Sequence, residues 1–352
     1  ARRTFLLDRG AWDKPAEPIA PGGLAALHPL PADAPRDRLT FARWLVAKEN
    51  PLAARVAVNR VWQAVWGAGL VETAEDFGVR GSPPSHPELL DWLAVDFMER
   101  GWSLKTLLRT IVSSEAYQQS SAASPERLER DPKNALLSRG PRFRPDAEVV
   151  RDVVLANAGL LNLKLGGPYV FPPVPESLLS LSYAKVDFWK TATGPDRYRR
   201  SLYVFRRRSL PDPLLCSFDA PNGDVAAARR GRSNTPLAAL TALNEPVLVE
   251  ASRAFALRVL KEGGATDAER MDHAFRICTS RRPNDAERAA LQDLLDHQRK
   301  RIADGWLSAK ELTTGDGAKL PALPEGCTPA DAAVWTVAGR VLLNLDETLT
   351  KN

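Results

Sequence analysis

The chain has 352 residues, of which 44% are apolar and 26% charged, and these proportions suit a globular protein with one large core or two moderate ones. A formal net charge of +5 is too mild for a dedicated nucleic-acid binder, and no helix-turn-helix, zinc-finger or aromatic RNA-binding signature accompanies it. No run approaches the roughly 20 consecutive apolar residues that a membrane-spanning helix needs. We therefore expect no membrane span and no nucleic-acid partner.

Residues with metal-binding side chains are scattered. The three cysteines, Cys216, Cys278 and Cys327, lie far apart and form no CxxC or CxxCH pattern, and the four histidines are equally dispersed. The sequence therefore predicts no metal site and no cofactor in this chain.

The first 37 residues predict an extended N-terminal connector. Thr4 to Leu7 reads as a strand already under way, which leads us to expect that the chain continues a longer polypeptide. The stretch from residue 10 to 38 is rich in proline, glycine and alanine and has no sustained apolar period.

Helix signals begin near Arg38 and define a helical region over residues 38–166. A helix is expected from Asn50-Pro51 to Gly67, and Ser85-His86-Pro87-Glu88 matches a capping box for another. Ser103 is expected to cap the next helix, and a further helix lies within residues 145–163.

Residues 167–233 have a different character and form a predicted irregular, Arg-rich insert. Prolines and aromatic residues are frequent, and residues 201–205 (SLYVF) are the best strand candidate of the chain. Nine arginines stand against four acids between Asp196 and Arg232, so this stretch is the basic centre of the molecule. Long irregular inserts of this kind are often functional.

A second helical region follows over residues 234–352. Helix starts are predicted at Thr235-Pro236, Asn244-Glu245-Pro246, Thr266, Asn284 and Thr328-Pro329. We expect a mainly α fold, an irregular multi-helix bundle in which residues 234–352 pack on residues 38–166 as one composite domain, with a long Pro/Arg-rich, partly extended insert between them.

Several ordered strings resemble family 1553 of the domains of unknown function, also called planctomycete-specific domain one. They are ARWL at 42–45, NPL at 50–52, VNRVW at 58–62, PSHPELLDW at 84–92, FDAP at 218–221, RR at 229–230, NTPL at 234–237 and VLLNLDE at 341–347. Ala226 and Ala238 depart from the family pattern, where cysteine and glutamine are usual, so a thiol mechanism is not expected here.

The resemblance implies a secreted or periplasmic, multi-domain parent protein. In that family the domain follows a cytochrome-c-like region, so haem is expected only upstream of this chain, and the upstream domains are its expected partners. The genomic setting of such proteins is rich in polysaccharide-degrading enzymes, which suggests an anionic glycan as a further partner.

The richest candidate site lies in residues 218–235. Asp219 and Asp224 are candidate catalytic bases, while Arg229, Arg230, Arg232, Asn222 and Asn234 are candidate ligand-binding residues, because forked guanidiniums hold anions bidentately. The alternative is that these acids and arginines pair with one another to order a loop, while Asn234 and Thr235 cap a helix.

Other candidates lie outside that stretch. His86, at a predicted helix N-terminus, is a third candidate base or else a ring packed against the cap. Arg206 belongs to the basic centre, and Trp189, in an irregular stretch, is a candidate sugar-stacking residue. The function predicted is an extracytoplasmic accessory module that binds anionic or carbohydrate ligands; an enzyme, either a hydrolase or a sugar-directed redox component, is the alternative.

Overall fold

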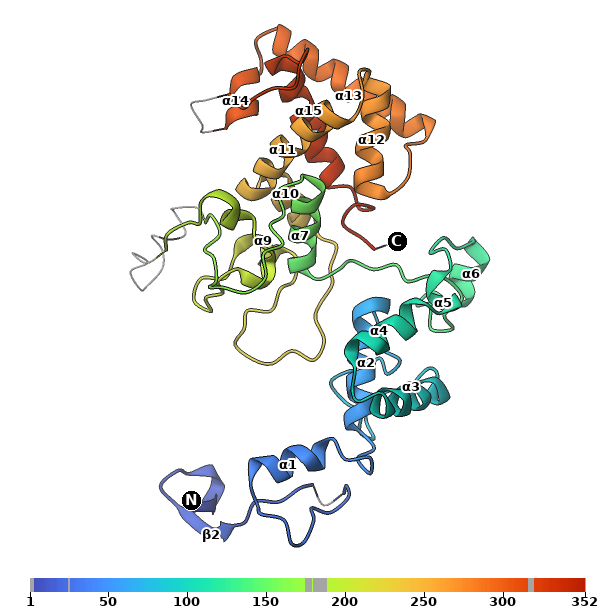
Figure 1. The fold of residues 1–352 in the computed structure, drawn as a ribbon, viewed down its shortest axis with the longest axis vertical. Helices are drawn as coiled ribbons and strands as arrows, with labels where there is room; N and C mark the ends of the chain where they lie inside the picture. The colour runs from blue at the N-terminus through green and yellow to red at the C-terminus, as the bar shows by residue number, and fades with distance from the viewer. Residues whose placement is uncertain (1–2, 25, 175–178, 180–188, 316–319, 352) are drawn as a thin grey trace. The chain divides into compact units, whose positions relative to one another are not determined.

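The computed structural model describes residues 3–24, 26–174, 179, 189–315 and 320–351 (Figure 1). The fold is mainly α-helical, as predicted, and divides into two compact units, Ala1–Pro141 (unit 1) and Arg142–Asn352 (unit 2). Each helix in the described ranges is too short or too polar to cross a bilayer.

Unit 1 opens with a small hairpin. Strand β1 (Thr4–Leu7) pairs antiparallel with β2 (Pro15–Ile19), so the predicted strand at Thr4 is present and the connector contains its partner. Helix α1 (Arg38–Leu45) begins where the Asp37 carboxylate accepts the backbone N–H of Thr40 at 2.8 Å.

The core of unit 1 lies between three helices, α2 (Ala53–Trp66), α3 (Pro87–Glu99) and α4 (Leu104–Val112). Two shorter helices follow, α5 (Glu115–Gln118) and α6 (Pro125–Arg130). Ser103 caps α4 as predicted, with its Oγ accepting the N–H of Thr106 at 3.3 Å. The apolar positions at helical spacing therefore face one another inside this bundle.

The predicted capping box at Ser85 does not form. Helix α3 has Pro87 as its first residue, His86 as its N-cap and no side-chain cap. The backbone N–H of Ser85 instead donates to the carbonyl of Leu70 at 2.8 Å, which holds Ser85 to the loop after α2. Ser85 is therefore one position too early to cap the helix.

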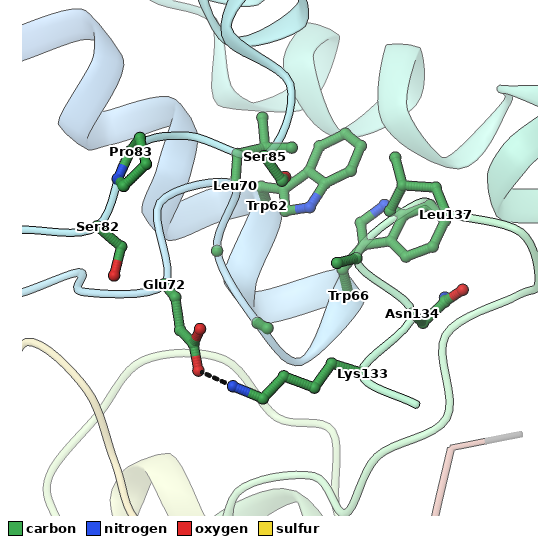
Figure 2. A pocket seen from close by; sticks show the side chains of 13 residues that line it. Trp62, Trp66, Leu70, Glu72, Ser82, Pro83, Ser85, Lys133, Asn134 and Leu137 are labelled. Atoms are coloured by element: carbon green, nitrogen blue, oxygen red, sulfur yellow. Dashed lines mark hydrogen bonds and ion pairs between the residues drawn. The ribbon is translucent and has the colours of Figure 1, made fainter. Parts of the chain in front are cut away.

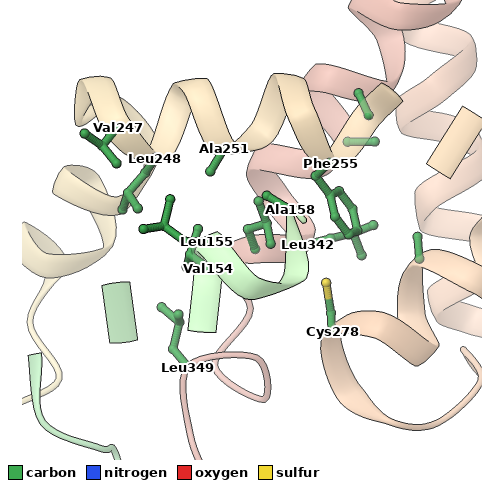
Figure 3. Packing of buried hydrophobic residues seen from close by; sticks show 14 of the residues in the cluster. Val154, Leu155, Ala158, Val247, Leu248, Ala251, Phe255, Cys278, Leu342 and Leu349 are labelled. Atoms are coloured by element: carbon green, nitrogen blue, oxygen red, sulfur yellow. The ribbon is translucent and has the colours of Figure 1, made fainter. Parts of the chain in front are cut away.

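Unit 2 contains the larger core (Figure 3). Its helices are α7 (Ala147–Asn157), α9 (Pro213–Ser217), α10 (Pro236–Asn244), α11 (Pro246–Glu262), α12 (Asp267–Thr279), α13 (Asp285–Ala303), α14 (Ala309–Thr314) and α15 (Pro329–Leu343). Leu155 from α7 and Phe255 from α11 are both fully buried in the cluster, and Leu342 of α15 joins them. Within unit 2, α7 thus packs on the C-terminal helices; the packing of residues 234–352 on the rest of 38–166 stays a prediction.

Helices α11 and α15 approach closely because the contact residue on α15 is glycine. A Cβ added to Gly339 would lie 3.1 Å from Cδ1 of Phe255 and 3.2 Å from the carbonyl oxygen of Ser252. The absence of a side chain therefore sets the distance between these two helices.

The prediction of a strand over residues 201–205 is wrong. Two short 3-10 helices occupy this region, η2 (Gly194–Tyr198) and η3 (Ser201–Tyr203). Val204 makes an isolated β-bridge to Val170. The backbone N–H and hydroxyl of Ser201 both donate to the Asp152 carboxylate on α7, at 2.7 and 2.8 Å. These bonds tie the segment to a helix instead of a neighbouring strand. Residues 175–178 and 180–188 of the predicted insert lie outside the described residues.

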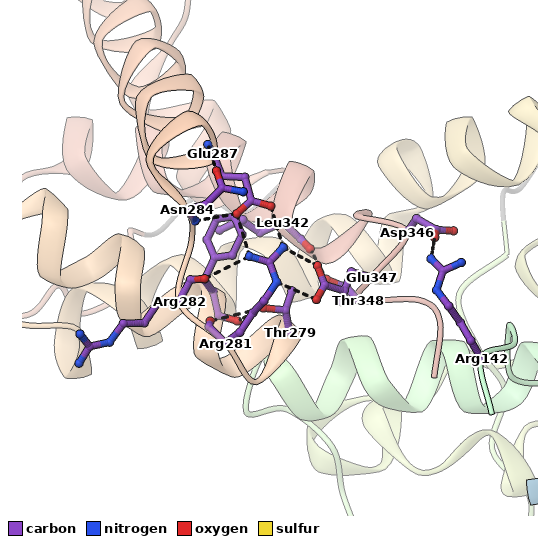
Figure 4. A network of polar contacts seen from close by, with 11 residues as sticks. Arg142, Thr279, Arg281, Arg282, Asn284, Glu287, Leu342, Asp346, Glu347 and Thr348 are labelled. Carbon is purple, nitrogen blue, oxygen red and sulfur yellow. Dashed lines mark hydrogen bonds and ion pairs between the residues drawn. The ribbon is translucent and has the colours of Figure 1, made fainter. Parts of the chain in front are cut away.

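Ion pairs join the C-terminal tail to the α12–α13 turn (Figure 4). The Arg281 guanidinium donates to Glu347 at 2.6 and 2.8 Å and to Glu287 at 2.7 and 2.8 Å. These hydrogen bonds lower the pKa of Glu287 to about 2. One guanidinium therefore fixes the start of α13 and the chain after α15 in one arrangement.

Candidate functional site

A depression of about 310 Å³ in unit 2 includes two of the predicted ligand-binding side chains. Its lining comes from the segment before α7, the end of the loop before α10 and the chain after α15: Arg142, Phe143, Arg144, Arg232, Ser233, Asn234, Asp346 and Thr350. Arg232 and Asn234 were predicted from the sequence; the others were not.

Backbone contacts bring two walls of the depression together. The N–H of Phe143 donates to the carbonyl of Lys351 at 3.2 Å, and the N–H of Lys351 donates back at 2.9 Å. This bridge holds the C-terminal tail beside residues 142–144, which are separated from it by more than half of the sequence.

Asp219 anchors the third wall. Its carboxylate accepts the backbone N–H of Ser233 at 2.6 Å and the Ser233 hydroxyl at 2.8 Å. The backbone of Asp219 has φ +63°, a left-handed conformation that few residues other than glycine, asparagine and aspartate adopt readily. The predicted catalytic base is thus committed to holding the loop next to the depression.

Arg144 and Arg142 share one carboxylate. Arg144 donates to the Ser233 carbonyl at 3.2 Å and to the Asn234 side-chain oxygen at 3.0 Å, and it lies 3.5 Å from Asp346. Arg142 donates to the other oxygen of Asp346 at 2.8 Å (Figure 4). Asp346 and Arg142 remain half exposed, so this carboxylate is a solvent-accessible anion held between two guanidiniums.

Arg232 completes the set. Its guanidinium lies over the ring of Phe143, 4.7 Å from the centroid, and 3.5 Å from the Asp146 carboxylate. The lining therefore carries three guanidiniums and one carboxylate beside an aromatic ring, and Asp146 stands outside the lining as the partner of Arg232. Such a surface is suited to hold an anionic group by forked hydrogen bonds.

Arg230 and Arg206 meet elsewhere on unit 2. Both guanidiniums pair with Glu148 of α7, and the bond from Arg230 is 2.7 Å long. Burial, and then the charge of Arg230, lower the pKa of Arg206. These two arginines secure the insert to α7 and do not line the depression.

The remaining predicted residues of the loop face solvent. Asp224 and Asn222 are bonded to each other, and Asn222, Asp224 and Arg229 are outside the depression. His86 belongs to unit 1, where its Nδ1 lies 3.1 Å from the Ser85 hydroxyl. Of these positions, Asn222 lines a cavity of about 20 Å³ beside Asp212.

Trp189 is a buried packing residue, not an exposed platform. Its side chain is 8% exposed, its indole N–H donates to the Pro172 carbonyl at 3.1 Å, and its ring packs on Phe171 and Phe205. The prediction that its face meets a sugar is therefore corrected, because neighbouring aromatic rings cover the indole.

Sequence reasoning missed two carboxyls with raised pKa values, Asp212 and Glu245. Burial raises both, and the charge of Asp212 adds to the effect on Glu245, whose pKa reaches about 7. Each caps a helix, accepting from Leu215 and Leu248 at 3.0 Å. An acid directly before a proline, as in Asp212-Pro213, was the signal that could have identified them.

The space beside Asp212 is small. The cavity that it lines together with Cys216 and Arg206 measures about 20 Å³, enough for about one water molecule. In the described ranges, no three histidine, cysteine, aspartate or glutamate side chains gather as a metal site requires.

Comparison with known proteins gives a family without an assigned activity. Residues 37–295 match the model of PSD1, a protein of unknown function (DUF1553). No match was found among curated proteins or among solved structures. Because the matched region covers well over half of the sequence, the chain belongs to the PSD1 (DUF1553) family.

Proposed function

We propose that this chain is a non-catalytic binding module and that the unit 2 depression holds the carboxylate or sulfate of a glycan. The observation that carries the proposal is the convergence of Arg142, Arg144 and Arg232 on one cavity from two segments far apart in the sequence. Arg197, Arg200, Arg206 and Arg230 of the basic stretch pair with acids outside the depression, and Arg232 lies 3.5 Å from Asp146. Inside the depression, Arg142 and Arg144 share the half-exposed carboxylate of Asp346.

Asp346 shows how an anion fits this surface. One of its oxygens lies 2.8 Å from Arg142 and the other 3.5 Å from Arg144. A carboxylate or sulfate from outside would find the same donors after displacing Asp346, which is half exposed and sits on the tail after α15. The internal ion pair is therefore a competitor of the proposed ligand.

The rest of the lining suits a sugar that carries the charge. Phe143 contributes an aromatic ring, while Ser233, Asn234 and Thr350 contribute hydroxyl and amide groups. A cavity of about 310 Å³ has room for more than a lone anion. We propose an acidic glycan over a free inorganic ion for this reason.

The enzyme alternative has less support. Asp219 is bonded to Ser233, and Asp224 lies exposed on its loop. Glu245 has a pKa suited to proton transfer, but its carboxylate accepts the N–H of Leu248 as a helix cap. A proton-transfer group needs a substrate-sized space next to it, and the cavity beside Asp212 is about 20 Å³.

The family resemblance adds the setting that we propose for the module. It would form part of an exported multi-domain protein of planctomycete type, downstream of a cytochrome-c-like region that carries haem. In that setting the module would present a polysaccharide to its upstream domains.

A glycan screen tests this proposal. The purified chain is titrated with neutral, carboxylated and sulfated oligosaccharides, and Arg232→Gln and Arg142→Gln are compared with Arg208→Gln, an exposed arginine of the same basic stretch outside the depression. We expect an acidic glycan to bind, and each depression variant to weaken binding about tenfold, because a charge-assisted hydrogen bond is lost.

The control variant Arg208→Gln should bind within twofold of the wild type, and raising the salt concentration should weaken binding in all forms. Equal affinity for neutral and acidic glycans, or equal loss in all three variants, would contradict the proposal. Thermal unfolding of each variant confirms that the comparison is made between folded proteins.

A further inference from the structure

A second cavity lies wholly within unit 1, beside the end of α2 (Figure 2). It measures about 170 Å³, and its lining includes Trp62, Trp66, Glu72, Ser85 and Lys133. None of these residues takes part in the unit 2 depression. Its chemistry also differs, because two indoles replace the guanidiniums.

The loop that shapes this cavity is held firmly in place. The Asn59 side chain, which is fully buried, donates to the carbonyl of Val71 at 3.1 Å and accepts its N–H at 2.8 Å. A Cβ added to Gly69 would lie 2.6 Å from both the Asn59 amide nitrogen and the Val71 carbonyl oxygen. The cavity is therefore preformed by packing that tolerates little change.

The two indoles form a parallel pair. The rings of Trp62 and Trp66 stack with centroids 5.1 Å apart and an interplanar angle of 5°, and Figure 2 shows them side by side. The edge of Tyr117 meets Trp66 at 5.7 Å. Both side chains line the cavity, and with 5% and 7% of their surface exposed they form a rigid apolar part of its wall.

Trp66 also carries an unused donor. Its side chain is 7% exposed, and its indole N–H finds no acceptor among the residues that the structure describes. A buried N–H without an acceptor is costly, and in native proteins a ligand or an ordered water commonly satisfies it. Because Trp66 lines the cavity, an oxygen atom of a ligand bound there is a candidate acceptor.

The rim of the cavity is electrically balanced. Lys133 donates to Glu72 at 2.9 Å, and both side chains are more than half exposed (Figure 2). The ammonium and carboxylate charges cancel, so the cavity has no excess charge with which to attract an ion. Hydroxyl groups of Ser82 and Ser85 complete a lining that is both apolar and polar without being charged.

We infer that this cavity binds a neutral polyhydroxylated ring of monosaccharide size. The apolar face of the ring packs against the paired indoles, and one ring oxygen or hydroxyl accepts the hydrogen bond of Trp66. This site is separate from the acidic-glycan site proposed for unit 2, and either assignment can fail without the other.

Indole N–H resonances of the whole chain, labelled with ¹⁵N-tryptophan, test the inference. The probes are methyl glucoside, methyl galactoside and methyl xyloside, with glucuronate as a charged counterpart. Trp66→Phe and Trp92→Phe assign two signals, and Trp92, which is 55% exposed on α3 and outside the cavity, is the matched control. We expect a saturable shift of the Trp66 signal with a neutral glycoside, and no saturable shift of the Trp92 signal.

Two variants separate hydrogen bonding from charge. Trp66→Phe keeps an aromatic ring but removes the donor, so it should weaken binding about five- to tenfold. Lys133→Gln alters only the exposed rim and should leave the affinity for a neutral glycoside within twofold, and Arg232→Gln in unit 2 should do the same. If Trp66→Phe does not fold, the Trp66 signal is assigned by sequential assignment of the wild-type protein, and the wild-type shift and the Lys133 comparison then decide.

Three results would overturn the inference. They are an unchanged Trp66 signal with every neutral glycoside, a preference for glucuronate that Lys133→Gln abolishes, and shifts of equal size at Trp66 and Trp92. The first would leave water as the acceptor of the indole N–H, and the second would show recognition of charge.

Discussion

Replacing Asn59 by alanine should destabilise unit 1 strongly. The substitution removes the two hydrogen bonds of 2.8 and 3.1 Å that pair the Asn59 amide with the backbone of Val71. Val71 is 3% exposed, so solvent cannot readily replace the lost partner. Each unsatisfied buried group costs about 1–3 kcal/mol, which gives a loss of roughly 2–6 kcal/mol in unfolding free energy. That is a large part of the stability of a typical domain.

The loss is measured by urea denaturation monitored through hydrogen exchange of the backbone amides of residues 53–72. These amides report on α2 and its loop alone. Arg60→Ala, the exposed neighbour on the same helix, is the control and should change stability by less than about 0.5 kcal/mol. A change below about 1 kcal/mol for Asn59→Ala would refute the view that this amide holds the loop.

Three further predictions concern unit 2. Gly339→Val should lower the free energy of unfolding by about 1–3 kcal/mol, because even the Cβ of the new side chain would lie 3.1 Å from Phe255. An unchanged melting temperature would argue against tight packing between α11 and α15. The folded-state pKa of Glu245 is raised from 4.5 to about 7, so its contribution to stability is fully present below about pH 4.5 and is lost as pH rises through 7. Glu245→Gln should reduce the fall in melting temperature between pH 5.5 and pH 8, and an equal fall in the variant and the wild type would contradict this. The pKa of Glu287 is lowered to about 2 by Arg281, so its contribution is present above about pH 4.5 and is lost as pH falls toward 2. Arg281→Met should reduce the loss of stability as pH falls from about 4.5 toward 2. Equal acid denaturation of the variant and the wild type would contradict this.

Local signals in the sequence predicted the helices well. Ser103, Thr235, Thr266 and Thr328 all cap helices as expected, because a cap depends on a side chain and a backbone N–H only two or three residues apart. The prediction failed at residues 201–205, where a β-prone composition was overridden by the bonds from Ser201 to Asp152, 49 residues away in the sequence.

The candidate site was predicted only in part. Arg232 and Asn234 were identified from the density of charged and amide groups along one stretch. Arg142 and Asp346, which complete the depression, lie 204 residues apart, and nothing in local composition indicates that they meet. Asp219 was read as a base because the sequence shows its charge but not the Ser233 donors that occupy its carboxylate.

The affinity of Asp346→Asn for an acidic glycan, measured by isothermal titration beside the wild type and Arg142→Gln, tests the central claim most directly. Because Asp346 competes with the ligand for two guanidiniums, its neutralisation should strengthen binding by up to about fivefold, while Arg142→Gln should weaken it. Weaker or unchanged binding by a correctly folded Asp346→Asn protein would contradict the assignment of this depression as the anion site.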